Sequence, residues 1–214
     1  MIQVVGIGAG GHAKVLLDIL RLMNVYHVVG LLDPGCVGTS VGDVPVLGGD
    51  ELLPRLHAEG IAAAFIGVGG VGDNALRSKL FEKVQAAGFT FINVIHPAAI
   101  LAPSVQLGQG AAIMAGAIVN PDARIGDNVI INTGAIVEHD CEIASHAHIS
   151  PGAVLCGGVR VGMGAHIGAG ATVRQYVTIG ERAVVGAGAV VVKDVEAGIM
   201  VVGIPAKPII LNKG

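Results

Sequence analysis

Every sixth residue from Ile95 to Val191 is isoleucine, leucine or valine, without one exception. The residue four positions after each of them is alanine, valine or cysteine. A repeat of six residues is too short for a helical solenoid and is typical of a β-helix built from hexapeptide turns. Each hexapeptide supplies one short strand and one corner, so that three of them close a triangular coil of 18 residues.

The side chains of this repeat divide between the inside and the outside of the coil. Alternate side chains of a strand share a face, so the aliphatic residue and the small residue two positions before it point inward. Glycine, asparagine and aspartate gather at the corners, where the backbone must turn tightly. Small inward residues also fit a chain of 214 residues with 34 glycines and only 3% aromatic residues. We therefore expect an all-β domain, a parallel β-helix, over residues 95–214.

The first part of the chain has a different pattern, in which strand-like and helix-like segments alternate. The strand candidates are IQVVGIG, HVVGLLD, AAFIGVG and FTFINVI, and the helix candidates are HAKVLLDILRLM, DELLPRLHAEG and DNALRSKLFEKVQAAG. The last helix is expected to begin at Asp73 or Asn74 and to end at Gly88. Alternating strands and helices predict a Rossmann-like α/β domain with a small parallel sheet over residues 1–94.

A glycine-rich loop lies between the first predicted strand and the first predicted helix. Residues 6–11 read G-x-G-x-x-G, and Asp33 ends the next strand. This pattern is typical of a dinucleotide site, because glycines let backbone N–H groups approach a phosphate at a helix N-terminus. A complete dinucleotide fold needs two βαβαβ halves, whereas the hexapeptides begin after about one. We favour a nucleoside diphosphate over NAD, with an unliganded turn as the alternative.

Composition and charge exclude several classes of protein. No apolar run approaches the roughly 18–20 residues that span a membrane, and the first residues do not resemble a secretory signal. A net charge of −3 without a basic block argues against nucleic acid as the main partner. Three cysteines without zinc or redox spacing indicate a reducing compartment. We expect a soluble, cytoplasmic protein.

The segment VEHDCEIASHAH places three histidines within one and a half hexapeptide turns of each other, and a fourth follows one coil later. His148 and His166 differ by a full coil and are expected to stack on one outer face, about 4.8 Å apart. His139 lies half a coil from His148 and must occupy another face, while His146 lies at a corner. No three of them converge within one chain, which disfavours an intramolecular zinc site. Cys141 takes an inward position and is expected to fill the core.

Several motifs together carry a family resemblance that covers essentially the whole chain. They are GAGGHAK, LLD, FIGVG, the hexapeptides, IVEHDCEI and VVGIPAKPI. With them the chain resembles the bacterial nucleotide-sugar acetyltransferases of the hexapeptide-repeat superfamily, which act on precursors of bacillosamine and perosamine, and the sialic-acid O-acetyltransferases. The resemblance implies a left-handed β-helix, a homotrimer, acetyl-CoA as cosubstrate and a nucleotide sugar held by the N-terminal domain.

Matching the family's motifs implies substrate-binding residues in the N-terminal domain. Gly10, Gly11 and His12 would contact the diphosphate or the sugar, Asp33 the base, and Gly69 the nucleotide. Some members carry a second acid after the aspartate, where this chain has Pro34, so the base is left open. For His12 the alternative is a polar residue in the first turn of a solvated helix.

The same resemblance implies His139 as general base and Asp140 as its carboxylate partner, with Glu138 as the rival acid. A histidine suits this role, since an unperturbed pKa of about 6.5 allows it to accept a proton from an attacking amine. His148 matches a position that contacts acetyl-CoA. Because His139 and His148 lie on different faces, we expect a cleft between two subunits to bring one of each together.

The late coils are expected to hold coenzyme A. Ala169 and Ala187, in HIGAGA and VVGAGA, would contact it through their backbone, and Lys207 would meet a phosphate. For all three, an ordinary structural role in the β-helix or its tail is the alternative, and a structural role is favoured for His146 and His166.

The predicted function is acetyl-CoA-dependent N-acetylation of a UDP- or GDP-linked amino sugar for a cell-surface glycan. O-acetylation of a sugar such as sialic acid is the nearest alternative. A metal-dependent enzyme of hexapeptide type and a non-catalytic nucleotide-sugar-binding module are the others.

Overall fold

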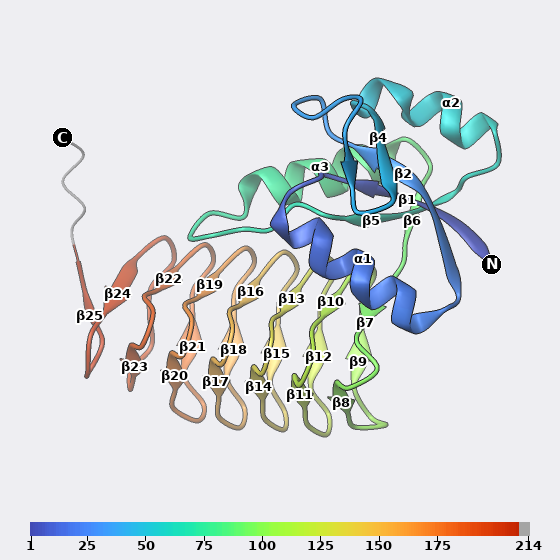
Figure 1. Ribbon diagram of the computed structural model, residues 1–214. Coiled ribbons are helices and arrows are strands. Elements are labelled where there is room, and N and C mark those ends of the chain that lie inside the picture. Colours follow the sequence, from blue (N-terminus) through green and yellow to red (C-terminus); the bar gives the residue numbers. More distant parts are fainter. Residues whose placement is uncertain (210–214) are drawn as a thin grey trace.

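The computed structural model describes residues 1–209, which form a small α/β unit seated on one side of a long β-helix (Figure 1). The α/β unit is a six-stranded sheet of order β3-β4-β2-β1-β5-β6. Its strands are β1 (Ile2–Ile7), β2 (Tyr26–Leu32), β3 (Ser40–Val41), β4 (Val44–Gly48), β5 (Ala63–Ile66) and β6 (Thr90–Phe91). All neighbours are parallel except β3 and β4, which form an antiparallel edge hairpin that the sequence analysis did not predict.

The helices cover both faces of this sheet. Helix α1 (Gly11–Met23) lies between the sheet and the β-helix, and its buried residues include Leu16 and Leu20. On the other face lie the short η1 (Asp50–Leu52), α2 (Leu53–Ala58) and α3 (Ala75–Ala86). The amide of Ala75 donates to Asp73 Oδ1 at 2.8 Å, so Asp73 provides the side-chain contact expected at the start of α3. A helix is thus found in each of the three segments predicted to be helical, and the second segment begins with the short helix η1.

The β-helix has three faces, each a stack of two- or three-residue strands. Face 1 contains β7 (Val94–Ile95), β10 (Ala112–Ile113), β13 (Ile130–Ile131), β16 (His148–Ile149), β19 (His166–Ile167), β22 (Val184–Val185), β24 (Met200–Val202) and the antiparallel β25 (Lys207–Pro208). Face 2 contains β8 (Ile100–Leu101), β11 (Ile118–Val119), β14 (Ile136–Val137), β17 (Val154–Leu155), β20 (Thr172–Val173) and β23 (Val190–Val191). Face 3 contains β9 (Gln106–Leu107), β12 (Arg124–Ile125), β15 (Glu142–Ile143), β18 (Arg160–Val161) and β21 (Thr178–Ile179).

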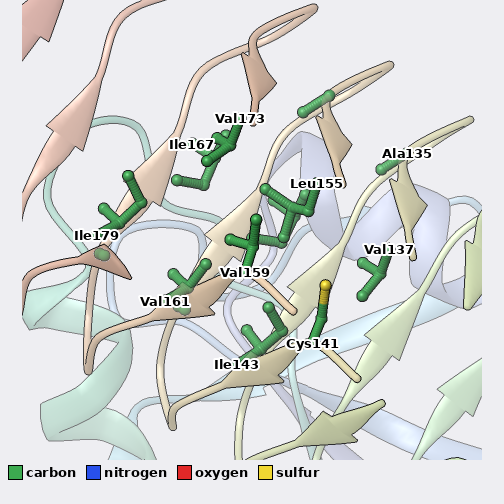
Figure 2. Close-up of a cluster of buried hydrophobic side chains, with 14 of the residues drawn as sticks. Ala135, Val137, Cys141, Ile143, Leu155, Val159, Val161, Ile167, Val173 and Ile179 are labelled. Atoms are coloured by element: carbon green, nitrogen blue, oxygen red, sulfur yellow. The ribbon is translucent and has the colours of Figure 1, made fainter. Parts of the chain in front are cut away.

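The interior is the aliphatic column that the six-residue period predicts. Parallel neighbours from β7 to β23 pair with an offset of 18 residues, for example Val119 with Val137 and Val137 with Leu155, whereas β22 and β24 pair with an offset of 16. Figure 2 shows these aliphatic side chains, with Ala135 and Cys141 among them, pointing into the coil. Because every layer repeats the same contacts, the β-helix presents three flat outer faces and three regular corners.

The α/β unit covers face 1. Outward-pointing Val94, Ala112 and Ile130 of that face form one apolar cluster with the buried residues of α1. The predicted strand FTFINVI divides at this junction, because Thr90–Phe91 extends the α/β sheet whereas Val94–Ile95 begins face 1. The division of the chain into domains 1–94 and 95–214 stays a prediction.

Candidate functional site

The glycine loop forms an open cradle at the N-terminus of α1. Gly8 has a φ of 98°. Helix α1 begins at Gly11, and no side chain caps its N-terminus because the N-cap residue is Gly10. Asp33 braces the loop, since its Oδ2 accepts the Ala9 amide and its Oδ1 the Gly35 amide, both at 3.0 Å. A Cβ atom on Gly10 or Gly11 would meet no atom within 4 Å. Uncapped amides facing open space at a helix N-terminus can bind an anion such as a diphosphate.

The loop after β5 forms the second side of this cradle. Gly69 lies against His12, because a Cβ on Gly69 would be 3.4 Å from the His12 Cβ. The Nε2 atom of His12 is enclosed and has no hydrogen-bond partner among the described residues. Burial, with Arg77 and His148 nearby, lowers the pKa of His12 to about 3. His12 is therefore neutral at pH 7, and any attraction of this loop for phosphate comes from its backbone amides.

His148 and His166 lie in adjacent coils on face 1 as the sequence predicts, with their rings edge to face. The two residues pair directly between β16 and β19, with ring centroids 5.0 Å apart. His148 Nδ1 lies 2.7 Å from the Gly70 carbonyl, which can only accept, so Nδ1 carries the proton. Nε2 then accepts from Asn132 Nδ2 at 3.1 Å, and burial together with His166 lowers the pKa of His148 to about 4. The contact of His148 with acetyl-CoA stays a prediction. To make that contact, His148 Nε2 would have to give up its hydrogen bond with Asn132 and bond to the ligand instead.

Arg77 is a buried cation that the sequence analysis did not identify. It is 2% exposed, and its Nη1 donates to the carbonyls of Ile66 at 2.9 Å and Val68 at 2.7 Å. Its Nε reaches the Asn128 carbonyl on the β-helix at 3.4 Å. Burial lowers the pKa of Arg77 to about 9, so that the guanidinium stays charged at neutral pH. Arg77 thus links the β-helix to the loop after β5, which contains Gly69.

A signal for Arg77 is present in the sequence, because it precedes Phe81 and Val84 by four and seven residues. All three lie on the buried stripe of α3. An arginine within an apolar stripe indicates a buried polar anchor. By contrast, Asn132 and the carbonyl of Gly70 could not be predicted as partners of His148, since only the fold brings them together.

His139 and Asp140 form a pair at the corner between faces 2 and 3, which we call corner 2–3. His139 Nδ1 lies 2.7 Å from Asp140 Oδ2, and both side chains are exposed. The ring extends over the next coil, where a Cβ on Gly157 would be 2.6 Å from its Nε2. The hydrogen bond that His139 donates to Asp140 raises the pKa of His139, while Glu138 contributes only a weaker charge effect. The arrangement leaves Nε2 free to accept a proton.

The other predicted residues lie elsewhere on the β-helix. Ala169 and Ala187 are exposed at corner 1–2, between faces 1 and 2, and their backbones are joined by the hydrogen bond from Gly188 N to Ala169 O at 2.8 Å. Lys207 is exposed in β25. Face 1 lies opposite corner 2–3 in the triangular coil, so one chain does not bring His139 together with the glycine cradle.

Two residues have structural roles here. His146 occupies corner 3–1, with its Nδ1 2.9 Å from Asn128 Nδ2 and its ring edge-on to Phe81. Cys141 is fully buried, and burial raises the pKa of its thiol to about 11, so it does not form a thiolate at neutral pH.

Neither a metal cluster nor a membrane-spanning helix is found between residues 1 and 209. No three His, Cys, Asp or Glu side chains of this part are placed to share a metal ion. None of its helices combines the length and the apolar character needed to cross a bilayer.

Comparison with known proteins agrees with both halves of this structure. The family model of the PglD N-terminal domain matches residues 3–84. The bacterial transferase hexapeptide model (six repeats) matches residues 104–139, 122–157 and 140–175. UDP-N-acetylbacillosamine N-acetyltransferase of Bacillus subtilis (strain 168) is 36% identical over 109 residues, which are 51% of this chain and 50% of that protein. The match therefore spans about half the length of that relative.

Two solved structures are similar over nearly the full length. A histidine-to-asparagine mutant of perosamine N-acetyltransferase from Caulobacter crescentus, in complex with CoA and GDP-perosamine, is 45% identical, with 96% of each chain covered and a TM-score of 0.92. The acetyltransferase domain of PglB from Neisseria gonorrhoeae, in complex with acetyl coenzyme A, is 40% identical, with 97% and 99% covered and a TM-score of 0.90. The chain therefore belongs to the hexapeptide-repeat acyltransferases with a PglD-type N-terminal domain and a left-handed β-helix.

Proposed function

We propose that this protein transfers the acetyl group of acetyl-CoA to the amino group of a UDP- or GDP-linked amino sugar. The observation that carries the proposal is the His139–Asp140 pair, a solvent-facing imidazole whose basicity a carboxylate raises. The glycine cradle, open at Gly10 and Gly11, suits a diphosphate. The similarity to enzymes crystallised with CoA and GDP-perosamine supports the choice of both substrates.

In the proposed mechanism, His139 is the general base and no acyl-enzyme forms. Asp140 accepts a hydrogen bond from the Nδ1–H group of His139, which leaves Nε2 unprotonated and able to accept a proton. Nε2 takes a proton from the sugar amine as its nitrogen bonds to the thioester carbon. The C–S bond then breaks, and the imidazolium returns the proton to the departing sulfur, giving the amide and CoA thiol. Cys141 takes no part, because its thiol is enclosed and protonated.

The nucleotide sugar is assigned to the N-terminal cradle. The backbone amides at Gly10, Gly11 and His12 would bind the diphosphate, favoured by the positive end of the α1 dipole. Asp33 already accepts two backbone amides, so contact with a nucleobase would use its remaining lone pairs. Gly69, which lies against His12 at the side of the cradle, would contact the nucleotide.

A trimer would complete the site, and the surface of the β-helix supports one. The outward residues of face 2 include Ile100, which is 63% exposed, followed by Ile118, Ile136 and Val154, all apolar. The outward residues of face 3 are polar, namely Gln106, Arg124, Glu142, Arg160 and Thr178. An apolar face on a regular rod is typical of an interface between copies. Packing three copies by face 2 would set corner 2–3 of one copy beside corner 1–2 of its neighbour. Ala169 and Ala187 of the neighbour would then line the same groove as His139, further toward the C-terminal end of the β-helix.

The test is a thiol-release assay with acetyl-CoA and UDP- or GDP-linked amino sugars. We expect His139→Asn to lower kcat at least a hundredfold, as expected for loss of a general base, while CoA and nucleotide-sugar binding persist. His27→Asn, at an exposed histidine of β2, is the matched control and should match wild type. Equal turnover in all three proteins would remove His139 from its role. Hydroxy sugars are tested in the same assay. If they alone were turned over, the proposed reaction would be O-acetylation instead of N-acetylation.

A further inference from the structure

Three histidines meet where the α/β unit contacts face 1 of the β-helix. Residues 69–74, which we call loop 69–74, connect β5 to α3 and reach over the β-helix (Figure 1). His12 of α1 lies against the first residue of this loop. On face 1, His148 Nδ1 donates to the Gly70 carbonyl of the loop at 2.7 Å, and the ring of His166 lies edge-on to that of His148. The three rings therefore form one cluster between loop 69–74, α1 and face 1.

The cluster is enclosed, and its polar atoms are incompletely paired. His148 and His166 are both buried. The Nε2 atom of His12 and the Nδ1 atom of His166 are enclosed without a hydrogen-bond partner among residues 1–209. The other ring nitrogen of His166 lies 3.2 Å from Ser150 Oγ. A proton added to one of these rings would place a charge where little water can reach it, which is unfavourable.

The charges around the cluster also oppose protonation. The buried guanidinium of Arg77, on α3, acts on both His12 and His148. No Asp or Glu carboxylate of residues 1–209 forms an ion pair with any of the three rings. Burial is the main cause that lowers the pKa of His12 to about 3 and that of His148 to about 4, and burial also lowers the pKa of His166. All three rings are therefore neutral at pH 7 in this conformation.

Loop 69–74 itself is held over the cluster by few contacts. Val71 is 93% exposed, and Gly72 has a φ of 72°, a conformation that glycine adopts without strain. Among the described residues, the side-chain hydrogen bonds between the loop and the β-helix are the one from His148 and two from Asn74 Nδ2 to backbone carbonyls, at 3.2 and 3.4 Å. A segment with so little buried apolar surface opens locally at a low cost in free energy.

We propose that loop 69–74 is a lid released by acid, which leaves face 1 below about pH 6 as His12, His148 and His166 take up protons. The open lid would let water reach the rings, whose pKa values would then return to about 6.5. Neutral rings favour the closed lid above that pH, and protonated rings favour the open lid below it. Because the lid begins with the predicted nucleotide contact at Gly69, its release would also open one side of the glycine cradle.

The size of the effect follows from the difference in pKa between the closed and open lid. Each ring lowers the ratio of closed to open lid about tenfold for every pH unit below about 6.5, until its pKa in the closed state is reached. For His12 and His148 alone, the ratio falls roughly a thousandfold between pH 7.5 and pH 5. A lid that is closed in all but a small fraction of molecules at neutral pH would thus be mostly open at pH 5.

His146 is the matched control, because it lies at the same junction in different surroundings. Burial lowers its pKa and Arg77 adds to this effect, but the charges of Glu82 on α3 and Asp127 at corner 3–1 oppose the shift. These carboxylates can compensate a proton on His146, so its titration should not move the lid.

The first test follows the motion of the lid. The chain contains no tryptophan, so Val71→Trp adds a single fluorescent probe at an exposed position of the loop. We expect the fast component of its anisotropy decay to grow at least twofold between pH 7.5 and pH 5, while far-UV circular dichroism stays constant. The same growth is expected when His146→Gln is added. It should vanish when His12→Gln, His148→Gln and His166→Gln are added together. A decay independent of pH, or growth that survives the triple replacement, overturns the proposal.

The second test uses the unmutated protein and so does not depend on whether the triple variant folds. Ring chemical shifts of isotope-labelled histidines are followed by NMR from pH 7.5 to pH 4.5. Because one opening event exposes all three rings, they should take up protons together, with a Hill coefficient above 1 and a shared midpoint. Three separate midpoints, or rings that stay neutral at pH 5, would contradict the lid. Neither test uses an acyl donor or a sugar, so the outcome is independent of the proposed function.

Discussion

The His139 ring is held by one hydrogen bond, from its Nδ1 to Asp140, with no other side chain bonded to it in the described part of the chain. Asp140 therefore controls both the orientation and the basicity of the ring. Aspartate is suited to this corner, because its φ of 59° lies in the region that aspartate tolerates better than most residues. Adjacency in sequence left Asp140 and Glu138 as rival partners of His139, and the family's motif favoured Asp140.

Asp140→Asn should move the pH dependence of catalysis. The active form has neutral His139, and the raised pKa places the acidic limb of the kcat/KM profile above its ordinary position near pH 6.5. Asparagine keeps the corner conformation but removes the anion, so the limb should move to lower pH and the plateau should fall about tenfold or more. Asp122→Asn, one coil earlier at the same corner, is the control. A limb that stays in place would show that Asp140 does not set the basicity of His139.

Residues with distant partners were less predictable. His148 was assigned to the outer side of face 1 correctly, but its bond to Gly70 crosses from the β-helix to the α/β unit, 78 residues away in sequence. No local pattern contains that information. His148 is only 7% exposed, and both of its ring nitrogens are hydrogen-bonded. Both properties depend on how the α/β unit packs on the β-helix.

At the level of elements, the six-residue period predicts the strands, corners and inward residues of the β-helix, because each coil repeats one set of inward contacts. The α/β unit was less regular. Hairpin β3–β4 was missed because β3 has two residues and Pro45 interrupts the apolar alternation of β4, and proline argues against a strand interior. Helix α3 was predicted, but its anchoring by Arg77 was not.

Arg77→Met should loosen the loop after β5. Methionine fills similar space but leaves the carbonyls of Ile66 and Val68 without their donor. Unsatisfied buried carbonyls cost about 1–3 kcal/mol each, so we expect a loss of about 2–6 kcal/mol in the free energy of unfolding by denaturant. Arg55→Met, at an exposed i,i+4 pair with Glu59 on α2, should cost under about 0.5 kcal/mol. Equal losses in the two variants would refute the anchoring role.

For the whole molecule, the arrangement of the three faces decides how a site can form. Face 1 is covered by the α/β unit, the outward residues of face 2 are apolar from Ile100 to Val154, and the His139 corner lies opposite face 1. The glycine cradle and the proposed base are thus separated within one chain. On this account each active site takes His139 from one copy and the nucleotide cradle from another.

Mixing two inactive variants tests this account most directly. His139→Asn removes the base, and Gly11→Phe fills the cradle at a position where a side chain meets no protein atom within 4 Å. The two tagged variants would be refolded together at equal amounts, and thiol release measured against each variant alone. Recovery of about one quarter of wild-type turnover is expected, because each of two neighbouring copies is the required variant half of the time. Turnover no greater than that of the separate variants would contradict a site shared between copies.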